Sequence, residues 1–115
     1  MTTPKFNLSQ KIRWVRLLIK GFFSSFEKDT ANAILQMSDA KNPVILDIGA
    51  NIGLVTKAFA RSSRKPKSII SVEPSTYVYE ILKRVSRNLP NVACFQVAIS
   101  DTKGFVNLNM PVKSS

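Results

Sequence analysis

The ten-residue stretch VILDIGANIG, residues 44–53, constrains the fold more than any other part of the chain. Its first half is a short apolar run of the kind that forms a fully buried strand, with one carboxylate, Asp47, near its end. Gly49 and Gly53 follow in a turn, and apolar residues then recur at helical spacing. A strand, a glycine turn and a helix in this order predict the first unit of a parallel α/β sheet. Asp47 then lies at the strand end where such sheets bind ligands.

The rest of the chain repeats this alternation. Further strands are predicted at 68–72, at 92–99 and, after a turn at 102–104, at 105–109, with helices at 52–61 and 76–88. Before Pro43 the pattern is helical, with one helix over 9–26 capped by Ser9 and another beginning at Asp29 or Thr30. We therefore divide the chain into a helical segment, 1–42, and a sheet-forming part, 43–115. Right-handed crossovers place the first strand at one edge of the sheet.

Composition narrows the function classes. Seventeen Lys and Arg against seven Asp and Glu give a formal charge of +10, which favours anionic partners such as nucleic acid or a membrane surface. With no His and a single cysteine, Cys94, we expect no metal site of the usual zinc kind and no internal disulfide. Neither a secretory signal nor an apolar run of roughly 20 residues is found, so we expect a cytoplasmic protein.

Three of the seven acids, Asp47, Glu73 and Asp101, fall at or just beyond predicted strand ends. Glu73 follows Gly53 by 20 residues, where an acid can accept hydrogen bonds from both ribose hydroxyls. It has no evident structural purpose in the sequence. For Asp47, the alternative to ligand binding is a plain tight turn that its carboxylate caps. For Asp101, the alternative is a carboxylate that forms the turn ahead of Gly104.

The glycine turn also limits which nucleotide fits. It lacks the Gly-x-Gly-x-x-Gly pattern of dinucleotide sites and the Gly-Lys-Ser/Thr of phosphate-binding loops. A carboxylate directly before the turn would repel a pyrophosphate. It suits a ligand with a cationic amine, and S-adenosylmethionine carries an ammonium, a sulfonium, a ribose and an adenine. This charge argument favours that cofactor.

Three segments in order, VILDIGANIG, SVEPSTYVYEILKRVSRN and NVACFQVAISDTKGFVNLNMP, resemble the FkbM family of S-adenosylmethionine-dependent methyltransferases. The resemblance covers about residues 43 to 111. It implies an α/β, Rossmann-like class I methyltransferase fold, a parallel sheet with flanking helices, incomplete at the C-terminus. The family's later Asp-x-Glu-Gly segment is missing, which puts catalysis in question more than cofactor recognition.

The resemblance also implies a role for each matching position. The methionine end of the cofactor would be held by Asp47, Gly49, Ala50, Asn51 and Gly53. Glu73 would bind the ribose. The adenine would be bordered by Pro74 and Ser75 and contacted through the backbone of Ala98, with Ser100 and Asp101 closing the site. No residue is assigned as a catalytic base.

Three functional hypotheses follow. The first is an FkbM-like methyltransferase acting on oxygen of a sugar, lipid-linked or natural-product acceptor, as the resemblance implies. The second is a cofactor-binding fragment without catalysis. The third is a basic protein that keeps the fold and binds nucleic acid or an anionic membrane. The exposed edge of the first strand also invites self-association.

The first helix carries Trp14 and several cations. We favour a solvated basic face, with Trp14 and the apolar side of the helix packed in the core. Cys94 is expected to be a buried strand residue.

Overall fold

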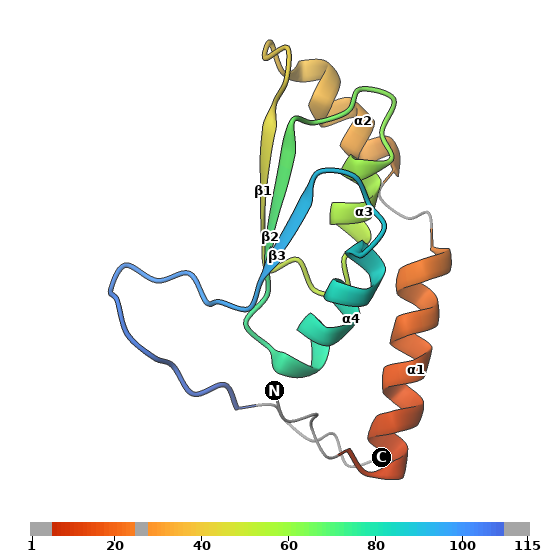
Figure 1. Ribbon diagram of the computed structural model, residues 1–115, viewed down its shortest axis with the longest axis vertical. Coiled ribbons are helices and arrows are strands. Elements are labelled where there is room, and N and C mark those ends of the chain that lie inside the picture. Colours follow the sequence, from red (N-terminus) through yellow and green to blue (C-terminus); the bar gives the residue numbers. More distant parts are fainter. Residues whose placement is uncertain (1–5, 25–27, 110–115) are drawn as a thin grey trace.

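The computed structural model describes residues 6–24 and 28–109, within which the chain forms four helices and three strands. The helices are α1 (Leu8–Phe23), α2 (Lys28–Met37), α3 (Leu54–Ala60) and α4 (Thr76–Ser86). The strands are β1 (Val44–Ile48), β2 (Ser68–Val72) and β3 (Val92–Phe95). The part after Pro43 thus alternates strand and helix as predicted (Figure 1).

The three strands form one parallel sheet in the order β1-β2-β3, so β1 lies at an edge as expected. β1 and β2 have the predicted bounds, but β3 ends at Phe95, before the predicted end at residue 99. The strand predicted at 105–109 is also wrong, because residues 96–109 form no strand. Alternating apolar residues continue there, yet nothing in the described chain pairs with them.

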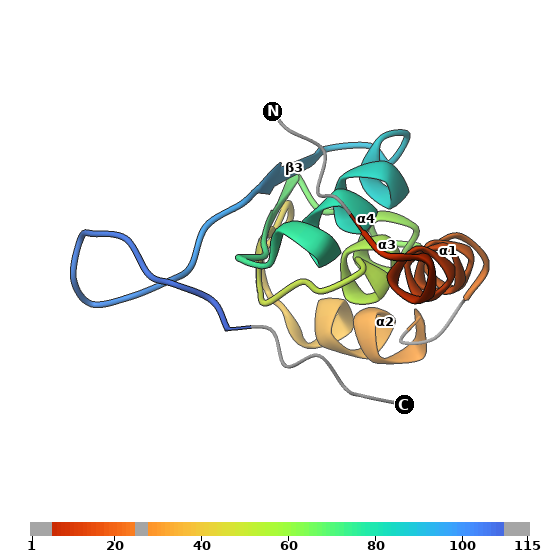
Figure 2. The same ribbon diagram turned by 90° about the horizontal axis from the view of Figure 1, so that it is seen from below.

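All four helices lie on one side of the sheet (Figure 2). The core between them and the strands is built around Leu35, Ile69, Ile81 and Leu82, each at most 1% exposed. The opposite side of the sheet is covered by no described helix, and β1 exposes Val44, Leu46 and Ile48 there. Self-association through this strand remains a prediction.

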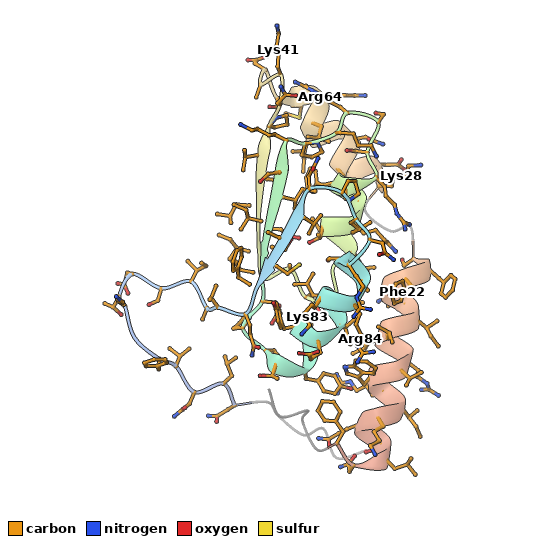
Figure 3. All side chains as sticks on the ribbon, viewed as in Figure 1. Phe22, Lys28, Lys41, Arg64, Lys83 and Arg84 are labelled. Atoms are coloured by element: carbon orange, nitrogen blue, oxygen red, sulfur yellow. The ribbon has the colours of Figure 1, made fainter. Side chains whose placement is uncertain are left out.

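The loop formed by residues 62–67 is partly built into the core. Ser62 is 1% exposed, and its hydroxyl donates to the Phe59 carbonyl at 2.6 Å. The Arg64 guanidinium reaches α2 (Figure 3) and donates to the carbonyls of Leu35 and Ser38 at 2.7 and 2.8 Å. Leu35 lies in the last turn of α2 and Ser38 directly follows the helix, where backbone carbonyls lack the regular intrahelical hydrogen bond. Arg64 therefore caps α2 rather than only facing water.

α1 is capped by Asn7 and not by Ser9. The Asn7 side chain accepts the backbone N–H of Gln10, and the Gln10 side chain accepts the N–H of Asn7, which completes a capping box. The Ser9 hydroxyl donates to Asn7 Oδ1 at 2.8 Å. Ser9 is thus inside the first turn, where it supports the cap.

Only one of two apolar sides of α1 packs in the core. Trp14, Leu17 and Leu18 pack on the cluster of Ile52, Ile81 and Val85, and the Arg84 guanidinium lies 4.8 Å from the centre of the Trp14 ring. The expectation for Trp14 is confirmed. The expectation is wrong for most of the predicted apolar side, because these residues are exposed: Ile12, Val15, Ile19, Phe22 and Phe23. Phe26, which belongs to the same prediction, lies outside the described residues.

Lys57 joins α1 to the rest of the fold. This side chain is 4% exposed, and its ammonium donates to the carbonyls of Gly21 at 2.6 Å and Phe22 at 3.2 Å. Both are acceptors in the last turn of α1, and a cation there also opposes the negative end of the helix dipole. Lys57 on α3 therefore caps the C-terminus of α1.

We expect Lys57→Met to lower the free energy of unfolding by about 2 kcal/mol, because it leaves two carbonyls without this donor. Urea unfolding, monitored by the fluorescence of Trp14, measures this loss of unfolding free energy. Trp14 is the single tryptophan of the chain and lies where α1 packs on the core. Lys67→Met is the control, since it removes the same charge from an exposed site. Equal losses in the two variants would contradict the capping role.

The same substitution carries a pH dependence. Burial, and secondarily the positive charge of Arg61, lower the pKa of Lys57 below 10.5. The Lys57 ammonium therefore loses its proton at a lower pH in the folded chain than in the unfolded chain. As the pH rises from this lowered pKa toward 10.5, the contribution of Lys57 to the free energy of unfolding increases. The difference in unfolding free energy between the wild type and Lys57→Met should therefore widen over this pH range.

Candidate functional site

The turn between β1 and α3 lies at the carboxyl end of the sheet, against the end of β2. The backbone N–H groups of Gly49 and Ala50 both donate to the Val72 carbonyl, at 2.9 and 3.0 Å. Gly49, Asn51 and Gly53 adopt positive φ angles of 70°, 52° and 87°. The turn is therefore a tightly wound loop fixed to the neighbouring strand.

The two glycines of this turn serve different purposes. A Cβ on Gly49 would meet nothing within 4 Å, so this residue leaves open space beside the turn. A Cβ on Gly53 would lie 2.9 Å from Cδ1 of Leu82 on α4. Gly53 therefore lets the turn pack against a helix, whereas only Gly49 keeps the backbone open to a ligand.

Asp47 is held by a hydroxyl from α3. The Thr56 hydroxyl donates to Asp47 Oδ2 at 2.6 Å, and Thr56 Oγ1 lies 2.7 Å from Ser71 Oγ. Thr56 has one hydroxyl proton, and a carboxylate can only accept. Ser71 must therefore donate to Thr56, which gives a directed chain from Ser71 through Thr56 to Asp47. Thr56 and Ser71 are both fully buried.

Strand register explains why these groups meet. Asp47, Ser71 and Cys94 are aligned across β1, β2 and β3, so a polar row crosses the helix-facing side of the sheet. Cys94 is half-buried, in partial agreement with the expectation, and this burial raises the pKa of its thiol. The sequence reasoning missed Thr56 and Ser71. The available signal was a pair of polar residues at positions that the apolar pattern assigns to the core.

Glu73 has a structural role that was not expected. Its two carboxylate oxygens accept the backbone N–H groups of Asn51 and Ser75, each at 3.0 Å. The side chain is only 9% exposed and is not among the residues that line the two cavities described below. Glu73 therefore ties the glycine turn to the start of α4. Each oxygen retains a lone pair, so ribose binding stays a prediction.

Two cavities open at this edge of the sheet. One, of about 260 Å³, is lined by the turn and by α1: Leu17, Lys20, Asp47, Gly49, Ala50, Asn51, Ile52, Leu54 and Val55. The other, of about 490 Å³, is lined by the segment after β3 and by Pro74. The residues that line this second cavity include Ala98, Ser100 and Phe105. The residues predicted for the methionine and adenine ends thus line separate cavities.

Not every residue predicted for the site lines a cavity. Pro74 and Ala98 line the larger cavity, while Gly53 and Ser75 line neither. Asp101 is exposed and accepts the Ser100 hydroxyl at 3.3 Å, which matches a local turn. The arrangement offers a carboxylate beside an open backbone turn, and a second, partly apolar cavity large enough for a planar ring.

Solved structures share this architecture. The N-terminal domain of EvdMO1, crystallised with S-adenosylhomocysteine bound, is similar with a TM-score of 0.54 and 25% identity, covering 64% of this chain and 31% of that one. A putative S-adenosyl-L-methionine-dependent methyltransferase from Methanococcus maripaludis gives 0.58 and 20%, covering 84% and 45%. A putative O-methyltransferase from Klebsiella pneumoniae gives 0.52 and 14%, covering 79% and 44%.

These similarities establish the fold. The three parallel strands with flanking helices are a Rossmann-like, methyltransferase-type arrangement, as the sequence predicted. The chain spans less than half the length of each of these structures. No protein-family model matches the chain, and neither does any curated protein sequence.

Proposed function

We propose that this chain forms the cofactor-binding part of an S-adenosylmethionine-dependent methyltransferase. The observation that carries the proposal is the carboxylate of Asp47, which lines a cavity beside the open backbone of Gly49. One Asp47 oxygen is occupied by Thr56, and in the described part of the chain the other has no hydrogen bond. That oxygen is available to the ammonium of the cofactor's methionine end.

The rest of the cofactor follows from the same edge of the sheet. Its ribose would lie near Glu73, and its adenine would enter the cavity lined by Pro74 and Ala98. The solved structure of the EvdMO1 domain with bound S-adenosylhomocysteine supports this choice of ligand. When bound, the cofactor supplies an electrophilic methyl group on a sulfonium.

We further propose that the enzyme is of FkbM type and methylates oxygen on a sugar, lipid-linked or natural-product acceptor. The three motif segments support this finer assignment. Transfer requires the acceptor oxygen in line with the breaking carbon–sulfur bond, and removal of the hydroxyl proton. We assign the chain's own residues to binding and orientation only.

Calorimetric titration of the 115-residue chain with S-adenosylhomocysteine tests the binding proposal. We expect Asp47→Asn to weaken binding at least tenfold, about 1.4 kcal/mol, because it removes the charge that faces the ammonium. Asn retains an oxygen to accept from Thr56, so the fold is kept.

The matched control is Asp39→Asn, which removes an exposed carboxylate after α2, at a position that lines neither cavity. Its affinity should equal that of the wild type. A folded wild-type chain that does not bind S-adenosylhomocysteine would contradict the proposal, and so would equal losses in the two variants. Binding without transfer to any offered hydroxyl acceptor would support the non-catalytic alternative.

A further inference from the structure

The outer side of α1 carries an unexplained apolar stripe. Its members are 44% to 83% exposed and are spaced four, three, four and three residues apart along the helix, with one more beside the last: Leu8, Ile12, Val15, Ile19, Phe22 and Phe23. This spacing places them on one side of a helix over about 21 Å. The side that packs on the core, with Trp14 and Gly21, is a different one. We call these six residues the outer stripe.

Cations border the outer stripe on both sides. At 100° per residue, Lys11 lies about 70° to one side of its centre and Arg16 about 70° to the other, with Arg13 and Lys20 beyond Arg16. All four side chains are exposed, and α1 contains no Asp or Glu. Long cationic side chains at such positions can lay their aliphatic stems on apolar surface while the charge reaches outward.

The position of α1 leaves this stripe accessible. α1 lies outside the layer formed by α2, α3 and α4, with the sheet on the far side of that layer (Figure 2). Many side chains of α1 project away from the rest of the molecule (Figure 3). A flat surface can therefore approach the whole length of α1 without meeting another described element.

We propose that the outer stripe docks α1 onto an anionic lipid membrane, with the helix lying in the plane of the interface. The apolar stripe would enter the boundary between headgroups and acyl chains, and the bordering cations would pair with acidic headgroups. Nucleic acid would satisfy the cations but would leave six large apolar side chains in water. No helix in the described ranges is long and apolar enough to cross a membrane.

Flotation of the 115-residue chain with lipid vesicles tests this proposal without any cofactor. Vesicles of phosphatidylcholine with one third phosphatidylglycerol should bind at least tenfold more chain than phosphatidylcholine alone. Val15→Ser with Ile19→Ser should reduce binding at least tenfold, and so should Lys11→Gln with Arg16→Gln. Raising the salt to 0.5 M should weaken the charge contribution, because it shortens the screening length to about 4 Å.

Matched controls distinguish binding through the outer stripe from nonspecific binding of the chain to vesicles. Ile34→Ser changes an apolar side chain on α2 that is 48% exposed, close to the 48% and 53% of Val15 and Ile19. Lys41→Gln with Lys67→Gln removes two exposed charges away from α1; Figure 3 places Lys41 at the end of the molecule near β1 and α2. Both controls should bind as the wild type does.

Three results would overturn the proposal. One is absence of wild-type binding to the anionic vesicles. Another is binding that the Val15→Ser and Ile19→Ser pair leaves unchanged, which would make it a purely electrostatic attraction. The third is stripe-dependent binding of an acidic amphipathic peptide without binding to vesicles, which would assign the surface to a protein partner. None of these results bears on S-adenosylhomocysteine binding.

Discussion

Gly53→Ala is expected to lower the free energy of unfolding by about 3 kcal/mol, from left-handed backbone strain and overpacking of the core. The φ angle of Gly53 is 87°, which an alanine adopts only with strain. The new Cβ would also lie 2.9 Å from Cδ1 of Leu82, a side chain with no exposed surface. A well-packed neighbour of this kind has little room to move. Urea unfolding followed by circular dichroism measures the loss.

Gly49→Ala is the control for backbone strain alone. Its φ angle is 70°, but a Cβ there meets nothing within 4 Å. The expected loss is about 1 kcal/mol. Leu82→Val removes the obstructing methyl. It should therefore lower the free energy of unfolding less in the Gly53→Ala background than in the wild type. Equal losses at Gly49 and Gly53 would show that steric contact with α4 is unimportant.

Much of the sheet could be predicted because buried parallel strands have a simple signature. Val44–Ile48 and Ser68–Val72 are short, mostly apolar runs followed by a glycine in the first case and by Glu73 and Pro74 in the second, and both have the predicted bounds. The alternating residues after Phe95 gave a false signal, since a strand also requires a partner. Pairing is a property of the fold and is not visible in the local pattern.

Helix α1 shows a second limit of sequence reasoning. Apolar spacing identified the helix, but two apolar sides of one helix cannot be ranked from the sequence alone. Packing of Trp14 against the core was predicted correctly, whereas Ile12 and Ile19, which belong to the apolar side expected in the core, are exposed. Ser9 was wrongly predicted as the N-cap because Asn and Ser are both favourable at that position. Only Asn7 has a Gln three residues later, Gln10, with which it forms a capping box.

The candidate site was predicted in its position but not in its internal support. Strand ends located Asp47 and Glu73 because carboxyl ends of parallel strands meet at one edge. The hydrogen bond from Asn51 to Glu73 joins residues 22 positions apart, and that from Thr56 to Asp47 joins residues nine apart. Such contacts depend on how α3 and the glycine turn pack, which the residue pattern does not specify.

Thr56→Val is the second substitution with a large expected effect. It nearly preserves the side-chain volume but removes the donor to Asp47 and the acceptor for the Ser71 hydroxyl. Leaving a buried hydroxyl unpaired should cost about 2 kcal/mol of unfolding free energy. Given the proposed function, affinity for S-adenosylhomocysteine should also fall about tenfold, since hydrogen bonds to charged groups contribute about 1.5–3 kcal/mol. Thr56→Ser keeps the hydroxyl and should retain most of the affinity.

Adding Ser71→Ala to Thr56→Val separates stability from positioning. The second change removes the unpaired hydroxyl, and replacing both partners by apolar groups can be nearly neutral. Unfolding free energy should therefore largely recover, while the Asp47 carboxylate still lacks its donor and the affinity stays low. If affinity recovered together with stability, Thr56 would only be supporting the fold, and the orientation of Asp47 would not depend on it. The double variant thus decides whether the directed chain from Ser71 to Asp47 serves the ligand or only the core.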